Sequence, residues 1–329
     1  MRGALDEVHA GSRGDAGRAQ AVRVIYIAGF GRSGSTVLDT VLGNHADTES
    51  VGELMYLNRA MTSDSEYCSC GEPARSCPFW AEVRARWLEL LPAGLDASAW
   101  HRLQARFERT RSLISVLRAR RRQGEDFAAY RAGVSALYRA IAELAEKEII
   151  VDSSKSPVRA LAIADMPGTD VRILHLVRDG RGCAGSLTKS YAPDPEAGIQ
   201  AYTPGRPVWR SALRWLVVNR LSELALGAYP AGWRARIFYE DLVADPRRVL
   251  AEIAPVAGLD LAHLADRLEA GERLKPHHSI AGNRLRMSGG VVLKADEDWR
   301  RNLTAGQRRV FWLLAGRLAR RYGYPRTPS

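Results

Sequence analysis

The sequence predicts an α/β fold with a central parallel sheet flanked by helices. Short apolar, β-branched runs alternate with amphipathic helical stretches, and each run ends in a glycine-rich or polar turn. Strands are expected at residues 22–28 ("VRVIYIA") and within residues 148–157, 170–182 and 234–242. Ligands of such sheets bind beyond the carboxyl ends of the strands, so the turns there are the candidate site.

The predicted elements place most of the chain in one domain. We expect this domain to span residues 22–329, with residues 60–148 as a mostly helical insertion or cap. Residues 1–21 are rich in glycine, alanine and charge and lack an apolar stretch, which predicts a disordered tail and no signal peptide. Because no run of about 18 apolar residues occurs, we expect no membrane span and a cytoplasmic location.

The charge balance favours anionic ligands. The chain carries 48 basic and 37 acidic residues, a formal net charge of +11. Nucleotides, nucleic acids and lipid headgroups are the partners that such a balance attracts. Lysine is rare among the basic residues, because only five of the 48 are lysines.

The first turn almost fits a phosphate-binding loop. Residues 29–36, "GFGRSGST", match the P-loop pattern at Gly29, Gly34 and Thr36, but Ser35 stands in place of the lysine. A strand precedes the turn and a helix pattern follows it, which is the context that such a loop requires. Backbone N–H groups can still hold a phosphate, but the contact to a γ-phosphate is lost. We therefore expect a ligand with one phosphate in the loop and a different group beyond it.

A second anion site is predicted in "LVRDGRGCAGSL", residues 176–187. Arg178 ends a strand, and Ser186 follows in the next helix. A forked guanidinium and a hydroxyl can bind one phosphate together. The alternative is an Arg178–Asp179 ion pair and a serine bonded to its own helix. No clear aspartate partner for Mg²⁺ follows an apolar run; the nearest candidates are Asp152 and Asp179, each at the end of an expected strand.

The two motifs "GRSGSTVL" and "VRDGRGCAGSL" resemble the nucleotide signatures of sulfotransferases that use 3′-phosphoadenosine-5′-phosphosulfate (PAPS). The resemblance is nearer the tyrosylprotein and carbohydrate enzymes than the aryl type, whose loop has lysine where this chain has Arg32. It extends from about residue 22 to 320 and is specific at the motifs. It implies a P-loop-like sheet and sulfuryl transfer from PAPS to an acceptor hydroxyl, with no metal required.

The resemblance also implies nucleotide contacts. The loop would hold the 5′-phosphosulfate, and Arg178 with Ser186 would hold the 3′-phosphate. Tyr239 would contact the adenine or the 3′-phosphate, or else be a core residue. Residues 275–303 resemble the mobile loop that folds over the nucleotide in this family. The implied contacts are Arg32, Ser33, Gly34, Ser35, Thr36, Arg178, Ser186, Tyr239, Asn283, Arg284 and Arg286.

Three residues are implied in catalysis. Glu53 aligns with the general base of tyrosylprotein sulfotransferases and would accept the proton of the acceptor hydroxyl. Lys155 would stabilise the transferring sulfuryl group, and Arg32 the leaving phosphate. Two alternatives remain open, because Glu53 could cap a helix near Leu54 and His45 could be the base. Asp152 would orient Lys155 or cap the following helix.

Three cysteines lie close together in "YCSCGEPARSCPFW", at Cys68, Cys70 and Cys77. They could bind zinc, but structural zinc needs four ligands and no histidine lies nearby in the sequence. A Cys70–Cys77 disulfide and a turn of packed free thiols are the alternatives. His277 and His278 are interpreted as cap or loop residues, and no metal site is predicted.

Two other functions compete with sulfuryl transfer. A P-loop kinase of small molecules would bind ATP and Mg²⁺. A non-catalytic nucleic-acid or anion-binding protein would use the basic surface. For the sulfotransferase we expect a small-molecule, sugar or lipid hydroxyl acceptor and no nucleic acid. Tryptophans of the expected cap could bind that acceptor: Trp80, Trp87, Trp100, Trp209 and Trp215.

Overall fold

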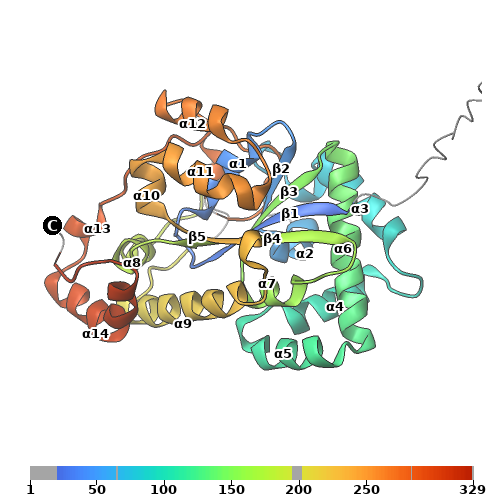
Figure 1. Ribbon diagram of the computed structural model, residues 1–329, viewed down its shortest axis with the longest axis horizontal. Helices are drawn as coiled ribbons and strands as arrows, with labels where there is room; N and C mark the ends of the chain where they lie inside the picture. The colour runs from blue at the N-terminus through green and yellow to red at the C-terminus, as the bar shows by residue number, and fades with distance from the viewer. Residues whose placement is uncertain (1–20, 64–65, 195–201, 283, 328–329) are drawn as a thin grey trace, which may run out of the picture.

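A computed structural model describes residues 21–327, except 64–65, 195–201 and 283 (Figure 1). Its centre is a five-stranded sheet in the order β2-β3-β1-β4-β5, in which every neighbouring pair is parallel. The predicted α/β class is confirmed. The tail predicted at residues 1–21 lies outside the described residues except for its last position. The strands are β1 Val22–Gly29, β2 Thr48–Gly52, β3 Ile149–Lys155, β4 Thr169–Val177 and β5 Arg234–Phe238.

Strand β1 lies in the middle of the sheet and is buried on both faces. Val24 and Tyr26 point into one hydrophobic core, while Ile25 and Ile27 point into another. This arrangement explains the unbroken apolar run, because a central parallel strand covered by helices on both sides has no polar face.

One face of the sheet is covered by α1, α11 and α12, which Figure 1 shows in blue and orange. Helix α11 begins with a proline after Asp245, whose side chain accepts the N–H of Arg248 at 3.0 Å. Proline suits the first helical position because its fixed φ fits the helix and no intrahelical donor is lost. The helices on this face are α1 Ser35–Gly43, α10 Tyr239–Ala244, α11 Pro246–Ala257 and α12 Ala262–Glu269.

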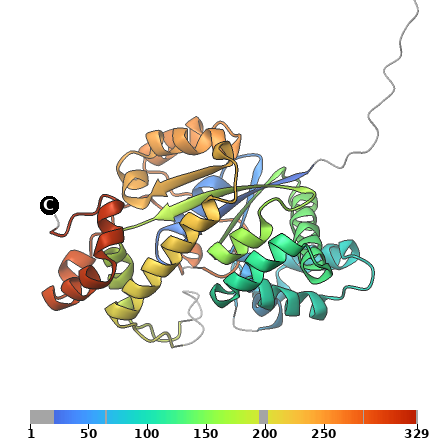
Figure 2. The same ribbon diagram turned by 60° about the horizontal axis from the view of Figure 1, so that its bottom comes forward.

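The opposite face is covered by α7 Pro157–Ile163 and α9 Val208–Leu226 and by the helices between β2 and β3. Figure 2 shows α9, in yellow, lying across the sheet. The helices between β2 and β3 pack on one another and on the sheet edge. They are α2 Leu57–Thr62, α3 Pro78–Leu90, α4 Ala97–Phe107, α5 Leu113–Arg122 and α6 Glu125–Ala145.

The expected role of the tryptophans in acceptor binding is wrong for most of them. Trp80, Trp87 and Trp100 are buried among α3, α4 and α6, and Trp215 is buried within α9. Large aromatic side chains fill cores at least as often as they line binding sites. Trp209 alone of the five is exposed.

The C-terminal part packs beside the carboxyl end of β4. It consists of α13 Trp299–Asn302 and α14 Ala305–Arg321, which pack against α8 Gly180–Thr188. Short 3-10 turns complete the fold at Leu54–Tyr56, Ala74–Ser76, Thr110–Ser112, Ala231–Trp233 and Arg284–Met287. In the described part of the chain, no helix is both long and apolar enough to cross a bilayer.

Candidate active site

The carboxyl ends of all five strands meet at one cavity of about 620 Å³. Glu53 follows β2, Lys155 ends β3, Arg178 follows β4 and Tyr239 follows β5. The glycine-rich turn follows β1, and its residues Gly31, Arg32, Gly34, Ser35 and Thr36 line the same cavity. The cavity has the size of an ordinary small-molecule site.

The glycine-rich turn directs the amino end of α1 at the cavity. Gly34 caps α1 with φ +92, and its carbonyl accepts the N–H groups of Val37 at 2.9 Å and Leu38 at 3.0 Å. The first N–H groups of a helix lack intrahelical acceptors and carry partial positive charge, so this end favours an anion. The structure does not bring Ser33 to the cavity: its side chain is buried, and its N–H donates to the carbonyl of Phe30 at 3.3 Å.

Gly34 has no room for a side chain. A Cβ atom there would clash with the ring of Tyr239, 2.7 Å from Cε2, and the left-handed φ adds strain. We expect Gly34→Ala to lower the free energy of unfolding by about 2–4 kcal/mol. Gly31→Ala is the matched control in the same turn, because a Cβ there meets nothing within 4 Å. Urea denaturation of both variants tests this, and an equal loss in the two would show that Tyr239 does not restrict position 34.

The two predicted anion motifs touch each other. Arg32 Nε donates to Ser186 Oγ at 2.8 Å, and Arg178 Nη1 donates to the carbonyl of Arg32 at 3.0 Å. The alternative pairing of Arg178 with Asp179 is not found, because Asp179 pairs with Arg181 at 2.7 Å. Arg178 instead pairs with Asp296 at 3.0 Å. The glycine-rich turn and the second motif therefore form one wall of the cavity.

Tyr239 links this wall to the last strand. The guanidinium of Arg178 lies over its ring, 4.7 Å from the centroid, and its hydroxyl donates to the carbonyl of Lys294 at 3.0 Å. The side chain is mostly buried but still lines the cavity. Both interpretations of Tyr239, as a core residue and as a site residue, are thus compatible with its position.

Glu53 and Lys155 form an ion pair at the cavity wall, in which Lys155 Nζ donates to Glu53 Oε1. Glu53 stands at the N-cap position of the turn that begins at Leu54, but its side chain makes no capping hydrogen bond. Lys155 has a left-handed φ of +65, and the register of β3 against β1 shifts just before it. Such backbone irregularities at strand ends are typical of functional sites.

Asp152 neither orients Lys155 through a direct contact nor caps α7. Its carboxylate is buried and accepts from Tyr138 at 2.6 Å and from Arg159 at 3.1 Å. Ser156 caps α7, accepting the N–H of Arg159 at 3.2 Å. A buried carboxylate needs such partners because an unpaired charge is costly. Both aspartates considered as magnesium ligands, Asp152 and Asp179, are therefore engaged with arginines.

His45 is not near the cavity. It follows the carboxyl end of α1, whereas the phosphate-binding turn precedes the helix, and its ring packs on His263 with centroids 5.1 Å apart. Among the described residues that line the cavity, none is a histidine. The alternative of His45 as the base therefore has no support from its position.

The predicted C-terminal loop covers the cavity. Residues 273–298, which we call the strap, contribute Arg284 and Lys294 to the lining. Asn283 lies outside the described residues. The structure does not bring Arg286 to the cavity: its guanidinium is buried and donates to the carbonyl of Tyr67 at 3.1 Å. The sequence shows that the loop is basic, but not which way each arginine turns.

Sequence reasoning missed three basic residues of the lining, Lys189, Arg273 and Lys294. The rarity of lysine was a usable signal, because three of the five lysines line this cavity. Seven basic and three acidic side chains line it among the described residues. Burial lowers the pKa of the Arg32 guanidinium, and the nearby cations Arg284 and Arg178 lower it further. A bound anion would relieve this repulsion, so the site favours a polyanionic ligand.

The chain belongs to the sulfotransferase family. A sequence model described as "Sulfotransferase family" matches residues 24–263, which include both anion motifs, Glu53 and Lys155. A separate search of curated proteins found no match.

Comparison with solved structures finds sulfotransferases of low sequence identity. The sulfotransferase domain of the Synechococcus PCC 7002 olefin synthase is 22% identical, covers 90% of this chain and 94% of its own, and has a TM-score of 0.48. The sulfotransferase domain from the curacin biosynthetic pathway is 14% identical, covers 94% and 99%, and has a TM-score of 0.45. Sulfotransferase STF1 of Mycobacterium tuberculosis H37Rv is 17% identical, covers 75% and 70%, and has a TM-score of 0.41.

Proposed function

We propose that this protein transfers the sulfuryl group of PAPS to an acceptor hydroxyl. One observation carries the proposal: a phosphate-binding turn without its lysine, a second anion motif and a Glu–Lys pair meet in a single basic cavity. The family membership supports sulfuryl transfer, and the donor set of the cavity supports a nucleotide with two separate phosphates.

The two ends of the donor would bind at the two motifs. The amide groups of Gly34, Ser35 and Thr36, with Arg32, would hold the 5′-phosphosulfate, because the amino end of α1 faces the cavity there. Arg178 and Ser186 would hold the 3′-phosphate, since a guanidinium binds phosphate through two parallel hydrogen bonds. Arg284 and Lys294 of the strap add positive charge above the site.

The Glu53–Lys155 pair suits the transfer step. The acceptor oxygen attacks sulfur as its proton passes to the Glu53 carboxylate, and the bond from sulfur to the 5′-phosphate oxygen breaks. The electron pair of that bond stays on the leaving phosphate, where Arg32 and Lys155 would neutralise the charge. The products are the sulfated acceptor and adenosine 3′,5′-bisphosphate.

The arrangement gives less support to a kinase. The lysine that contacts a γ-phosphate is absent, and the two strand-end aspartates that could hold Mg²⁺ bind arginines instead. A nucleic-acid binder would not need a buried carboxylate paired with a lysine at the centre of its anion site. The acceptor remains a small-molecule, sugar or lipid hydroxyl, and the cytoplasmic location stays a prediction.

Ligand-induced thermal stabilisation tests the proposal. We expect adenosine 3′,5′-bisphosphate to raise the Tm of the full chain in the presence of EDTA, because binding only to the folded state stabilises it. ATP with Mg²⁺ should give a smaller shift. A larger shift with ATP and Mg²⁺, and none with the bisphosphate, would favour the kinase. RNA binding that weakens steeply with salt, without bisphosphate binding, would favour the nucleic-acid binder.

A further inference from the structure

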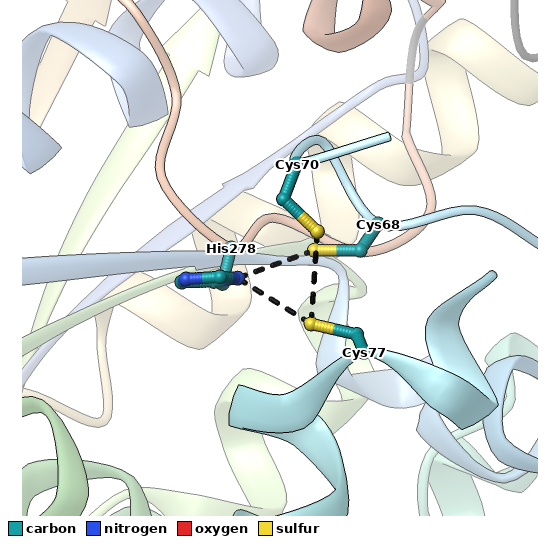
Figure 3. Close-up of side chains that lie close together, drawn as sticks. All are labelled: Cys68, Cys70, Cys77 and His278. Carbon is teal, nitrogen blue, oxygen red and sulfur yellow. Dashed lines mark hydrogen bonds between the residues drawn. The ribbon is translucent and has the colours of Figure 1, made fainter. Parts of the chain in front are cut away.

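Three thiols and one imidazole gather at a place that does not line the cavity (Figure 3). Cys68 and Cys70 come from the turn after α2, and Cys77 directly precedes α3. His278 comes from the strap and is 201 residues away from Cys77 in the sequence. This distance explains why no histidine was found near the cysteines, and all four cysteines of the chain are free thiols.

The four side chains have the spacing of a tetrahedral metal site. Cys68 Sγ and Cys77 Sγ lie 3.6 and 3.5 Å from His278 Nδ1, and Cys70 Sγ lies 3.7 Å from Cys77 Sγ. All four ligand atoms lie within 4.8 Å of one another. Tetrahedral zinc, with its usual bond lengths, separates two sulfurs by about 3.8 Å and a sulfur from a nitrogen by about 3.6 Å.

The surroundings hold these side chains in place. The N–H of Gly71 donates to the carbonyl of Cys68 at 3.0 Å and closes a tight turn around Cys70. The ring of His278 stacks on Phe79 with centroids 4.7 Å apart. The indole of Trp80 donates to the carbonyl of His278 at 2.8 Å. Partners that fix the orientation of a ligand are typical of metal sites.

We propose that Cys68, Cys70, Cys77 and His278 bind a structural zinc ion through three thiolates and Nδ1. Three cysteines and one histidine form one of the usual closed zinc sets, which leave no position open for a reacting water. A Cys70–Cys77 disulfide fits the geometry less well, because the two sulfurs lie 3.7 Å apart and would have to approach to about 2.05 Å. A disulfide would also give no role to Cys68 and His278, which lie beside Cys77.

The proposed zinc would fix the strap beside Glu53. Next to the ligands, the hydroxyl of Ser69 donates to the carbonyl of His277 at 2.6 Å and accepts the N–H of Ser279 at 2.8 Å. The carbonyl of Ile280 then accepts the N–H of Glu53 at 2.9 Å. The metal would thus add a covalent link between the turn at residues 67–78 and the strap segment that supports Glu53, alongside the hydrogen bonds that already join them.

The metal content of the purified full chain tests this proposal without any substrate. We expect about one zinc per chain by plasma mass spectrometry, in protein purified without chelators or a histidine tag. Cys77→Ser and His278→Ala should each reduce the zinc content to below about 0.2 zinc ions per chain. Cys183→Ser removes a thiol outside the cluster and His277→Ala removes the neighbouring imidazole, so both should keep the metal. Cys70→Ser, at an exposed position, replaces Cys77→Ser if that variant does not fold.

X-ray absorption of the zinc-loaded chain should show three sulfur ligands and one nitrogen ligand. Chelation should lower the Tm and expose the strap to limited proteolysis, and added ZnSO₄ should restore both. Two results would overturn the proposal: reduced wild-type protein that takes up no stoichiometric zinc from ZnSO₄, or a Cys70–Cys77 disulfide in freshly purified protein. Because none of these measurements involves PAPS, the outcome is independent of the proposed function.

Discussion

Glu53→Gln should reduce the turnover of sulfuryl transfer by roughly a hundredfold or more. Glutamine keeps the size of the side chain and can still accept a hydrogen bond from Lys155, but it cannot take up the proton of the acceptor hydroxyl. The affinity for adenosine 3′,5′-bisphosphate should stay near that of the wild type, because no nucleotide contact is assigned to Glu53. Transfer of radiolabelled sulfate to an acceptor identified from a cell extract, together with calorimetry of the bisphosphate, measures both quantities.

Glu49→Gln is a matched control for this variant. Glu49 is a buried carboxylate in β2, the strand that Glu53 follows, but it lies outside the cavity and its partner is His277 at 3.3 Å. The turnover of the Glu49→Gln variant, measured per folded molecule, should equal that of the wild type. If Glu53→Gln also keeps normal turnover, Glu53 is not the base and the ion pair with Lys155 is structural.

Arg178→Ala should weaken the binding of adenosine 3′,5′-bisphosphate by about 2 kcal/mol, or about 30-fold in Kd, since it removes a charge-assisted contact. The comparison with adenosine 5′-monophosphate makes the test specific to the 3′-phosphate. The wild type should prefer the bisphosphate strongly, and the variant should lose most of this preference. Calorimetry of the wild type and the Arg178→Ala variant, each with both nucleotides, measures the four affinities.

The control for Arg178 lies on β4, the strand that Arg178 follows. Arg172 is near the start of β4, pairs with Asp170 at 2.9 Å and does not line the cavity. Arg172→Ala should bind both nucleotides as the wild type does. If Arg178→Ala also discriminates normally between them, the contacts of Arg178 with Asp296 and Arg32 serve the fold alone.

Local sequence patterns predicted four of the five strands, because each of the four carries its own signal, whereas the short strand β2, "TESVG", has no apolar run. The run "VRVIYIA" is apolar at every position that must be buried, and the actual strand β1 extends it by a single glycine. The glycine-rich turn, Glu53, Lys155, Arg178 and Tyr239 all follow or end strands. Since parallel strands share one carboxyl edge, their convergence on one cavity follows from the topology.

Contacts between distant segments could not be predicted in the same way. His278 approaches the cysteines only because the strap returns to the edge of β2, and no local pattern encodes that path. The buried network of Asp152, Tyr138 and Arg159 likewise joins separate helices to β3. Arg286 shows the limit for a loop residue, since composition predicts positive charge there but gives no direction for the side chain.

Because the two anion motifs contact each other, the contributions of Arg32, Arg178 and Ser186 to donor affinity would depend on one another. Arg32 bonds Ser186, and Arg178 bonds the backbone of Arg32. A preorganised wall loses less conformational entropy when a ligand arrives. The same connection makes the three side chains one energetic unit, so their separate losses on truncation would not add up to the loss when all are removed.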